Sequence, residues 1–210
     1  MKKILYTLTL ISLVSCSSAY YRAWEKLGYE KRDILSSRVV KARDSQEDAK
    51  ERFKTALEKF GDVVKFDGGN LEKRYNVLSS EFENSEASAK DVRDRINSVE
   101  KVAEDLFDEW ERELADFQNA NLKRTSATKL RDTQNKYQDM IRTMRKAESK
   151  IDPVLLAFRD QVLFLKHNLN AKAISSLQDE TLKIETDVAR LVSEMEKSIS
   201  EADEFISSLS

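Results

Sequence analysis

Cysteine, histidine, proline and glycine are all scarce in this chain of 210 residues. It has one cysteine, Cys16, and one histidine, His167, so the chain alone cannot assemble a zinc site, a Cys-His nucleophile or an internal disulfide. It also lacks a Glu-x-x-His pair for a di-iron bundle and both common glycine-rich phosphate loops. We therefore expect no catalytic residue, no metal and no cofactor, and a protein that is not an enzyme.

The four glycines and the single proline indicate few turns, because these two residue types punctuate most of them. Charged residues make up 35% of the chain and apolar residues 40%, with a mean hydropathy of -0.60. This balance is typical of long amphipathic helices. Disorder is the alternative for so polar a chain, but the regular apolar spacing described below argues against it.

The N-terminal segment has the three parts of a secretory signal. Lys2 and Lys3 precede an apolar stretch over residues 4–14, and the small residue Ser15 follows it. The stretch is too short to cross ~30 Å of hydrocarbon as a helix, which takes roughly 20 apolar residues. We therefore expect residues 1–15 to be removed as a signal peptide.

The last residues of this segment, Leu13-Val14-Ser15-Cys16, resemble the bacterial lipobox. The resemblance implies that the thiol of Cys16 receives a diacylglycerol and that Cys16 becomes the first residue of the mature chain, 16–210. Two or three acyl chains would hold the protein stably on a membrane. Ser17 then favours the periplasmic face of the outer membrane over the inner membrane. Ordinary cleavage near Ala19, which would discard Cys16, is the alternative.

Apolar or small residues recur at alternating steps of four and three from residue 71 onward, which is the pattern of a heptad seam. A strand is excluded because neighbouring residues do not alternate in polarity. The seam predicts one long helix that packs against another along its whole length. It consists of Leu71, Tyr75, Leu78, Phe82, Ser85, Ala89, Val92, Ile96, Val99, Ala103, Leu106 and Trp110, and Phe117 extends it.

A less regular stripe precedes this seam and predicts a helix that starts near Tyr20 and passes Phe53 and Phe60. Gly68-Gly69 then supplies the backbone freedom for a reversal, so residues 20–118 should form an antiparallel hairpin. The aromatic residues near the start, Tyr20, Tyr21 and Trp24, fit either the core of this hairpin or a bilayer interface.

Two further heptad stripes predict helices over residues 122–166 and 172–208. Asp152-Pro153 has the composition of a helix start, but the stripe keeps its phase there, so we expect a kink or a closely stacked restart. Asn168 and Asn170 lower helix propensity between the stripes without forbidding a helix, which leaves three or four helices open. The fold class is therefore all-α, a long antiparallel coiled-coil bundle of three to four helices in a single elongated domain.

Charge is unevenly distributed along these helices. Residues 81–116 hold thirteen acidic and five basic residues, whereas residues 121–150 hold nine basic and three acidic ones. A basic run can bind nucleic acid or anionic lipid. Because a secreted protein rarely meets nucleic acid, and because an acidic helix precedes the basic one, we expect these two helices to pair with each other.

The segment 162–170 departs from the amphipathic pattern, because four apolar residues follow one another. Four in a row exceed what one seam can bury, so the segment should meet two neighbouring helices or a partner. His167 fits a hydrogen-bonding residue at a helix end better than a ligand. The possible interaction surface consists of Val162, Leu163, Phe164, Leu165, His167, Asn168 and Asn170.

This segment, together with residues 53–60, 66–75 and 106–110, resembles a known family. The resemblance is to the gammaproteobacterial uncharacterised helical lipoprotein family, domain of unknown function 2959, and it spans nearly all of the mature chain. It implies a helical protein with a lipoprotein signal and no catalytic residues.

We therefore expect a non-enzymatic cell-envelope lipoprotein that acts as a structural or adaptor coiled-coil protein. Its expected partners are the membrane, through the N-terminal lipid, and either another envelope protein or a second copy of the chain, with no nucleic acid. A membrane-acting protein that inserts residues 162–165, and a carrier of a small hydrophobic ligand, are the alternatives.

Overall fold

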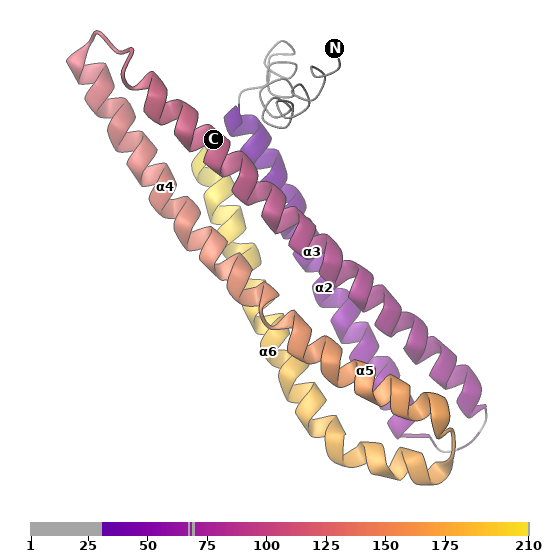
Figure 1. Cartoon of the computed structure of the whole chain (residues 1–210). Helices are drawn as coiled ribbons and strands as arrows, with labels where there is room; N and C mark the ends of the chain where they lie inside the picture. Colours follow the sequence, from indigo (N-terminus) through magenta and orange to yellow (C-terminus); the bar gives the residue numbers. More distant parts are fainter. Residues whose placement is uncertain (1–30, 67, 69, 210) are drawn as a thin grey trace, which may run out of the picture.

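The computed structural model describes residues 31–66, 68 and 70–209, and within them it contains five helices and no strand (Figure 1). The signal segment, Cys16 and the aromatic residues 20–24 lie outside the described residues. The helices are α2 (Lys31–Val64), α3 (Leu71–Glu113), α4 (Ala120–Glu148), α5 (Ile151–His167) and α6 (Ala171–Leu209).

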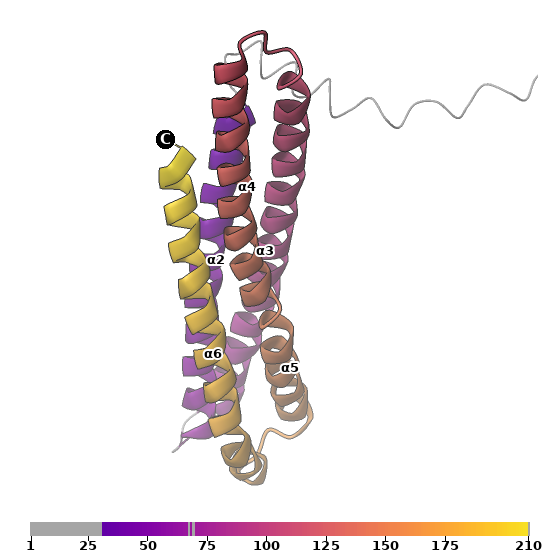
Figure 2. The same cartoon turned by 90° about the vertical axis from the view of Figure 1, so that its left-hand side faces the viewer.

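The helices form four antiparallel rods, because α4 and α5 follow each other end to end as one rod (Figure 2). Each rod packs against two neighbours. α2 contacts α3 and α6, and the α4–α5 rod also contacts α3 and α6, on the side away from α2. The contact between α2 and α3 is the most extensive of these. The expected all-α antiparallel bundle is therefore confirmed.

The reversal between α2 and α3 uses Gly68 of the predicted glycine pair, and Gly69 lies outside the described residues. Gly68 has φ of 137°, a region that L side chains rarely adopt. Asn70 then caps α3, since its side-chain oxygen accepts a hydrogen bond from the backbone N–H of Lys73 at 2.9 Å. Arg74 closes the turn by donating to the carbonyl oxygen of Asp62 at 2.6 Å. This local geometry brings α3 back along α2.

The heptad seam of α3 is the inner side of that helix. Its members from Leu78 to Leu106 are all buried, while Tyr75 and Trp110 are partly buried against the core. The extension of the seam to Phe117 was wrong, because α3 ends at Glu113 and Phe117 is 37% exposed in the following turn. Beyond the last helical turn, heptad spacing no longer places a residue on the inner side.

Aromatic residues link the rods in the core. The rings of Phe60 in α2 and Phe158 in α5 meet edge to face with centroids 6.2 Å apart. Tyr137 of α4 lies between Phe107 of α3 and Phe205 of α6, with centroid distances of 5.4 and 6.3 Å. Such ring pairs add about 0.5–1.5 kcal/mol beyond the burial of apolar area. Stripes that are far apart in the sequence therefore share one core.

The third rod has a break rather than one continuous helix. α4 ends at Glu148 and α5 starts at Ile151, so the chain makes the closely stacked restart that was one of the two expectations. Asp152 is not the N-cap, because the helix starts one residue before it and Lys150 takes the cap position. The physical reason is tertiary. Ile151 is fully buried in the core, and its burial favours including this residue in the first turn of α5.

The chain turns at residues 168–170, so the bundle has four rods and not three. The backbone N–H of Asn168 donates to the carbonyl oxygen of Leu165, and its side-chain amide donates to the carbonyl oxygen of Phe164 at 3.0 Å. These bonds satisfy carbonyl groups that the helix end would otherwise leave free. Asparagine therefore ends α5 by competing with the helical hydrogen bonds.

One polar pair is enclosed in the core. Gln46 of α2 and Ser198 of α6 are both fully buried, and the serine hydroxyl donates to the amide oxygen of Gln46 at 2.7 Å. The Nε2 atom of Gln46 has no hydrogen-bond partner within the described part of the chain. A buried polar contact of this kind favours one register of two helices at some expense of stability.

Candidate interaction surface

The outer side of α5 carries large apolar side chains that the bundle leaves uncovered. Leu156, Leu163 and Phe164 are 57%, 49% and 38% exposed. Positions seven and eight residues apart lie on the same side of a helix, so these three side chains share one face. We name Leu156, Leu163 and Phe164 the α5 surface. Leu169, 37% exposed, follows it in the turn to α6.

The helix divides the run of four apolar residues between two sides. Leu163 and Phe164 point outward, but Val162 and Leu165 are 7% and 0% exposed and belong to the core. Val162 and Leu165 therefore have to be removed from the expected interaction surface, because a helix of 3.6 residues per turn cannot present four successive residues on one face. His167, at the end of α5, is exposed.

The two asparagines of the expected surface lie in the turn between α5 and α6. Asn168 and Asn170 are exposed, but their hydrogen bonds are used in the turn itself. Leu156, which the segment-based interpretation missed, could have been found by counting seven residues back from Leu163. The surface that the structure supports is thus apolar and confined to one helical face.

Two neighbouring helices hold α5 in position and leave its outer face free. α5 packs against α3 and α6. On the α3 side, Arg159 pairs with Glu86, with a distance of 2.5 Å between Nη2 and Oε1, and Asp152 pairs with Arg93. The α5 surface is therefore presented by a helix whose inner side is fixed, which lowers the entropy lost when a partner binds.

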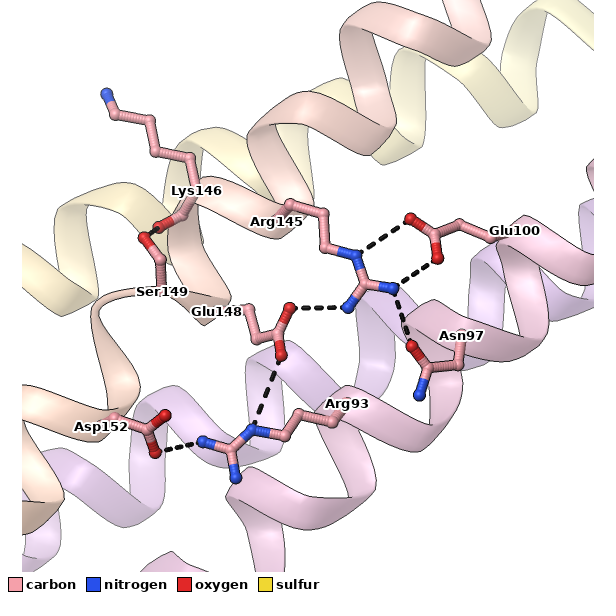
Figure 3. A network of polar contacts seen from close by, with 8 residues as sticks. All are labelled: Arg93, Asn97, Glu100, Arg145, Lys146, Glu148, Ser149 and Asp152. Carbon is pink, nitrogen blue, oxygen red and sulfur yellow. Dashed lines mark hydrogen bonds and ion pairs between the residues drawn. The ribbon is translucent and has the colours of Figure 1, made fainter.

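A network of ion pairs clamps the break between α4 and α5 onto α3 (Figure 3). The guanidinium of Arg145 bonds to both carboxylate oxygens of Glu100 on α3, to the amide oxygen of Asn97 at 2.7 Å and to Glu148 at 2.7 Å. Figure 3 shows Glu148 between the two arginines, since its other oxygen lies 3.5 Å from Nε of Arg93.

Hydrogen bonding changes the proton affinities in and beside this network. The bonds from Arg145 to Glu100, followed by those to Glu148, raise the pKa of Arg145 above its ordinary value, although partial burial opposes the shift. On the other side of α4, Lys146 reaches Glu194 of α6 at 3.0 Å and its hydrogen bond lowers the pKa of Glu194. These ion pairs connect α3, the α4–α5 rod and α6 at the break, so we assign them a role in stabilising the fold.

Most of the basic charge of α4 is not used in this way. Among the contacts described, Arg145 is the basic residue that bonds to the acidic helix α3, so the expected pairing of the two helices is confined to that site. Arg124, Arg131 and Arg142 lie seven and eleven residues apart, which places them on one outward side of α4. The exposed basic residues of α4 are Lys123, Arg124, Lys129, Arg131, Lys136, Arg142 and Lys146.

Neither a metal cluster nor a membrane-spanning helix is present in the described part of the chain. Among these residues, no three His, Cys, Asp or Glu side chains gather as metal ligands would. None of the helices between residues 31 and 209 combines the length and the apolar character needed to cross a bilayer.

The fold and its surface define the class: an antiparallel all-α bundle with an apolar face on one short helix. The chain belongs to the family described as Protein of unknown function (DUF2959), whose model matches residues 20–209. No curated protein matches the chain.

Proposed function

We propose that the protein is a non-enzymatic lipoprotein of the cell envelope that acts as a spacer and adaptor. In this proposal Cys16 carries the lipid, and Ser17 directs the protein to the periplasmic face of the outer membrane. The observation that carries the proposal is the α5 surface: a fixed helix presents Leu156, Leu163 and Phe164 to solvent. Exposed apolar side chains gathered on one face mark contact sites more often than scattered ones do.

The positions of the two ends of α2 support the spacer role. Lys31, the first described residue, pairs with Glu109 near the end of α3 at 2.8 Å, so the N-terminal segment enters the bundle at the end where α3 turns into α4. Phe60, near the other end of α2, contacts Phe158 of α5. The 30 residues from Lys31 to Phe60 span ~40 Å along a helix. An anchor on the N-terminal side would therefore hold the α5 surface far from the membrane.

The size of the α5 surface indicates what kind of partner it suits. Three large side chains supply much less than the roughly 800 Å² that each side of a stable complex buries. We therefore expect another envelope protein that binds transiently, and not a permanent dimer of this chain. Capture of a second copy would contradict the adaptor role.

The test is photo-cross-linking in living cells from a reactive amino acid placed at Leu163. A matched probe replaces Leu182, which is 73% exposed on α6 and lies outside the α5 surface. We expect one recurring envelope protein from position 163 and not from 182, and its loss in a Leu156→Asp variant. Equal products from both positions, or products made only of this chain, would refute the adaptor role. Cys16→Ala tests the anchor separately, since it should release the protein from the membrane fraction.

The second candidate function is a membrane-acting or lipid-binding bundle, and the same exposed apolar face favours it. Phospholipid cross-linked from Leu163, together with leakage of vesicles on adding the protein, would support that function. A protein product without leakage supports the adaptor.

A further inference from the structure

The end of the bundle opposite the α5 surface carries a second uncovered region, at the hairpin between α3 and α4. We name residues 114–131 the tip. Figure 1 shows the tip reaching past the C-terminal end of α6. Phe205, near that end of α6, lies against Tyr137 of α4, so α6 ends beside the middle of α4 and not beside the tip. From Leu114 to Lys129, every residue except Leu114 and Ser126 is exposed.

Two large apolar side chains lie at this tip. Phe117 is 37% exposed in the turn, and Leu122 is 57% exposed in the first turn of α4. The turn is ordered around them, because the side chain of Asn119 accepts hydrogen bonds from the backbone N–H groups of residues 121 and 122. Trp110 of α3 ties the hairpin together by donating to the hydroxyl of Ser126 at 2.8 Å. The apolar side chains are thus held outward on a stiff hairpin.

The tip is positively charged. It contains four basic residues and one acidic residue, Asp116, which gives a net charge of +3. Arg124 bonds to Asn121 and Arg131 lies 3.8 Å from Asp132, both on the helix itself. The other basic residues are Lys123 and Lys129.

The acidic residues nearest to the tip on α3 do not cancel this charge. Glu109 pairs with Lys31 at 2.8 Å. Glu111 accepts a hydrogen bond from the neutral amide of Gln134 at 3.0 Å and keeps its negative charge. Arg112 lies next to Glu113 in the sequence and offsets its charge. Lys31 and residues 109–131 together hold six basic and four acidic residues, so this end of the bundle keeps a net charge of +2.

We propose that the tip lies on the anionic phospholipid surface of the membrane that holds the lipid anchor, with Phe117 and Leu122 at the interface. This inference rests on the proposed lipid at Cys16. The chain has 14 residues between Cys16 and Lys31, which reach at most about 50 Å, and Lys31 lies at the tip end of the bundle. Basic residues beside exposed apolar ones are the usual composition of surfaces that bind anionic membranes.

The proposal gives the rod a direction. The tip faces the phospholipid headgroups, and the α5 surface points away from them at the other end of the bundle. Contact at the tip would also hold the rod upright, because it adds a second point of attachment to the membrane.

The experiment uses the full lipid-bearing chain, reconstituted into vesicles of phosphatidylethanolamine with either phosphatidylglycerol or phosphatidylcholine. An environment-sensitive dye is attached at Leu122→Cys or, as the control, at Leu182→Cys. We expect a blue shift of the emission at position 122 in phosphatidylglycerol vesicles and none at position 182. Lys123→Glu with Arg124→Glu should lower the bound fraction of the tip on the order of 5-fold for each basic residue. Lys166→Glu with Lys183→Glu, the same charge change at the far end, should leave it unchanged.

Flotation of the vesicles separates failure of the anchor from failure of the tip contact. If the protein floats but the dye at position 122 behaves like the dye at 182, or responds equally in both kinds of vesicle, the tip contact is refuted and the anchor stands. If the protein does not float and the dye labels Cys16 of the parent chain, the thiol is free, and both the anchor and the tip contact fall.

Discussion

Leu163 and Leu165 allow a matched test of how α5 is oriented. They are the same residue type, two positions apart, yet Leu163 is 49% exposed and Leu165 is fully buried. Changing a buried leucine to alanine costs about 2–5 kcal/mol, because the transfer energy is lost and a cavity remains. An exposed substitution usually changes stability by less than about 0.5 kcal/mol. Alanine raises helix propensity equally at both sites, so that contribution cancels.

Thermal unfolding followed by far-UV circular dichroism measures the difference. For a chain of this size, 1 kcal/mol shifts the Tm by roughly 2–4 °C. Leu165→Ala should therefore lower the Tm by roughly 4–20 °C, whereas Leu163→Ala should change it by less than about 2 °C. Equal shifts, or a larger shift for Leu163→Ala, would show that α5 is rotated about its axis, and the α5 surface would no longer exist.

Three further predictions concern polar groups. Ser198→Ala should destabilise the protein by about 1–3 kcal/mol in chemical unfolding, because it leaves the buried Gln46 amide without its partner, and adding Gln46→Leu should recover most of that loss. Arg145→Met should lower stability by about 1 kcal/mol at low salt and by less in high salt, since the Glu100 pair is only partly buried. Burial raises the pKa of Tyr137 to about 12, so the stability it contributes is complete below pH 10 and is lost as the pH rises towards 12. Tyr137→Phe should therefore flatten the decline in Tm over that range, and an unchanged pH profile would refute the burial argument.

The hairpin of α2 and α3 could be predicted because its signals are local. A seam that repeats every seven residues places one row of side chains on one side of a helix whatever surrounds it, and the α3 row from Leu78 to Leu106 is buried as expected. Gly68 could be recognised as a turn for the same reason, since its backbone freedom belongs to the residue itself.

The start of α5 was harder to predict because local and tertiary preferences compete there. Asp152-Pro153 has the composition of a helix start, yet the helix begins at Ile151, whose side chain is fully buried. Arg93 of α3 engages Asp152 through an ion pair, which uses the carboxylate that a cap would need. A contact between residues 59 positions apart thus displaced a boundary that the local sequence suggested.

The ends and the packing of the rods determined which apolar side chains stay exposed to solvent. The run of residues 162–165 was recognisable as unusual, but only the packing of α5 between α3 and α6 decided that Val162 and Leu165 go inward and Leu163 and Phe164 outward. At the other end, Phe117 and Leu122 are exposed because α3 has already ended and α6 stops short of the hairpin.

The sequence by itself thus determined the helices, their inner sides and the reversal at Gly68, because periodicity and backbone preference act within a few residues. The sequence left open whether the chain has three or four rods and whether the third rod kinks or restarts, and the tertiary structure decided both, together with the two uncovered regions. Those features depend on the relative lengths and registers of helices that are distant in the chain, and burial of a residue is a property of its neighbours in space.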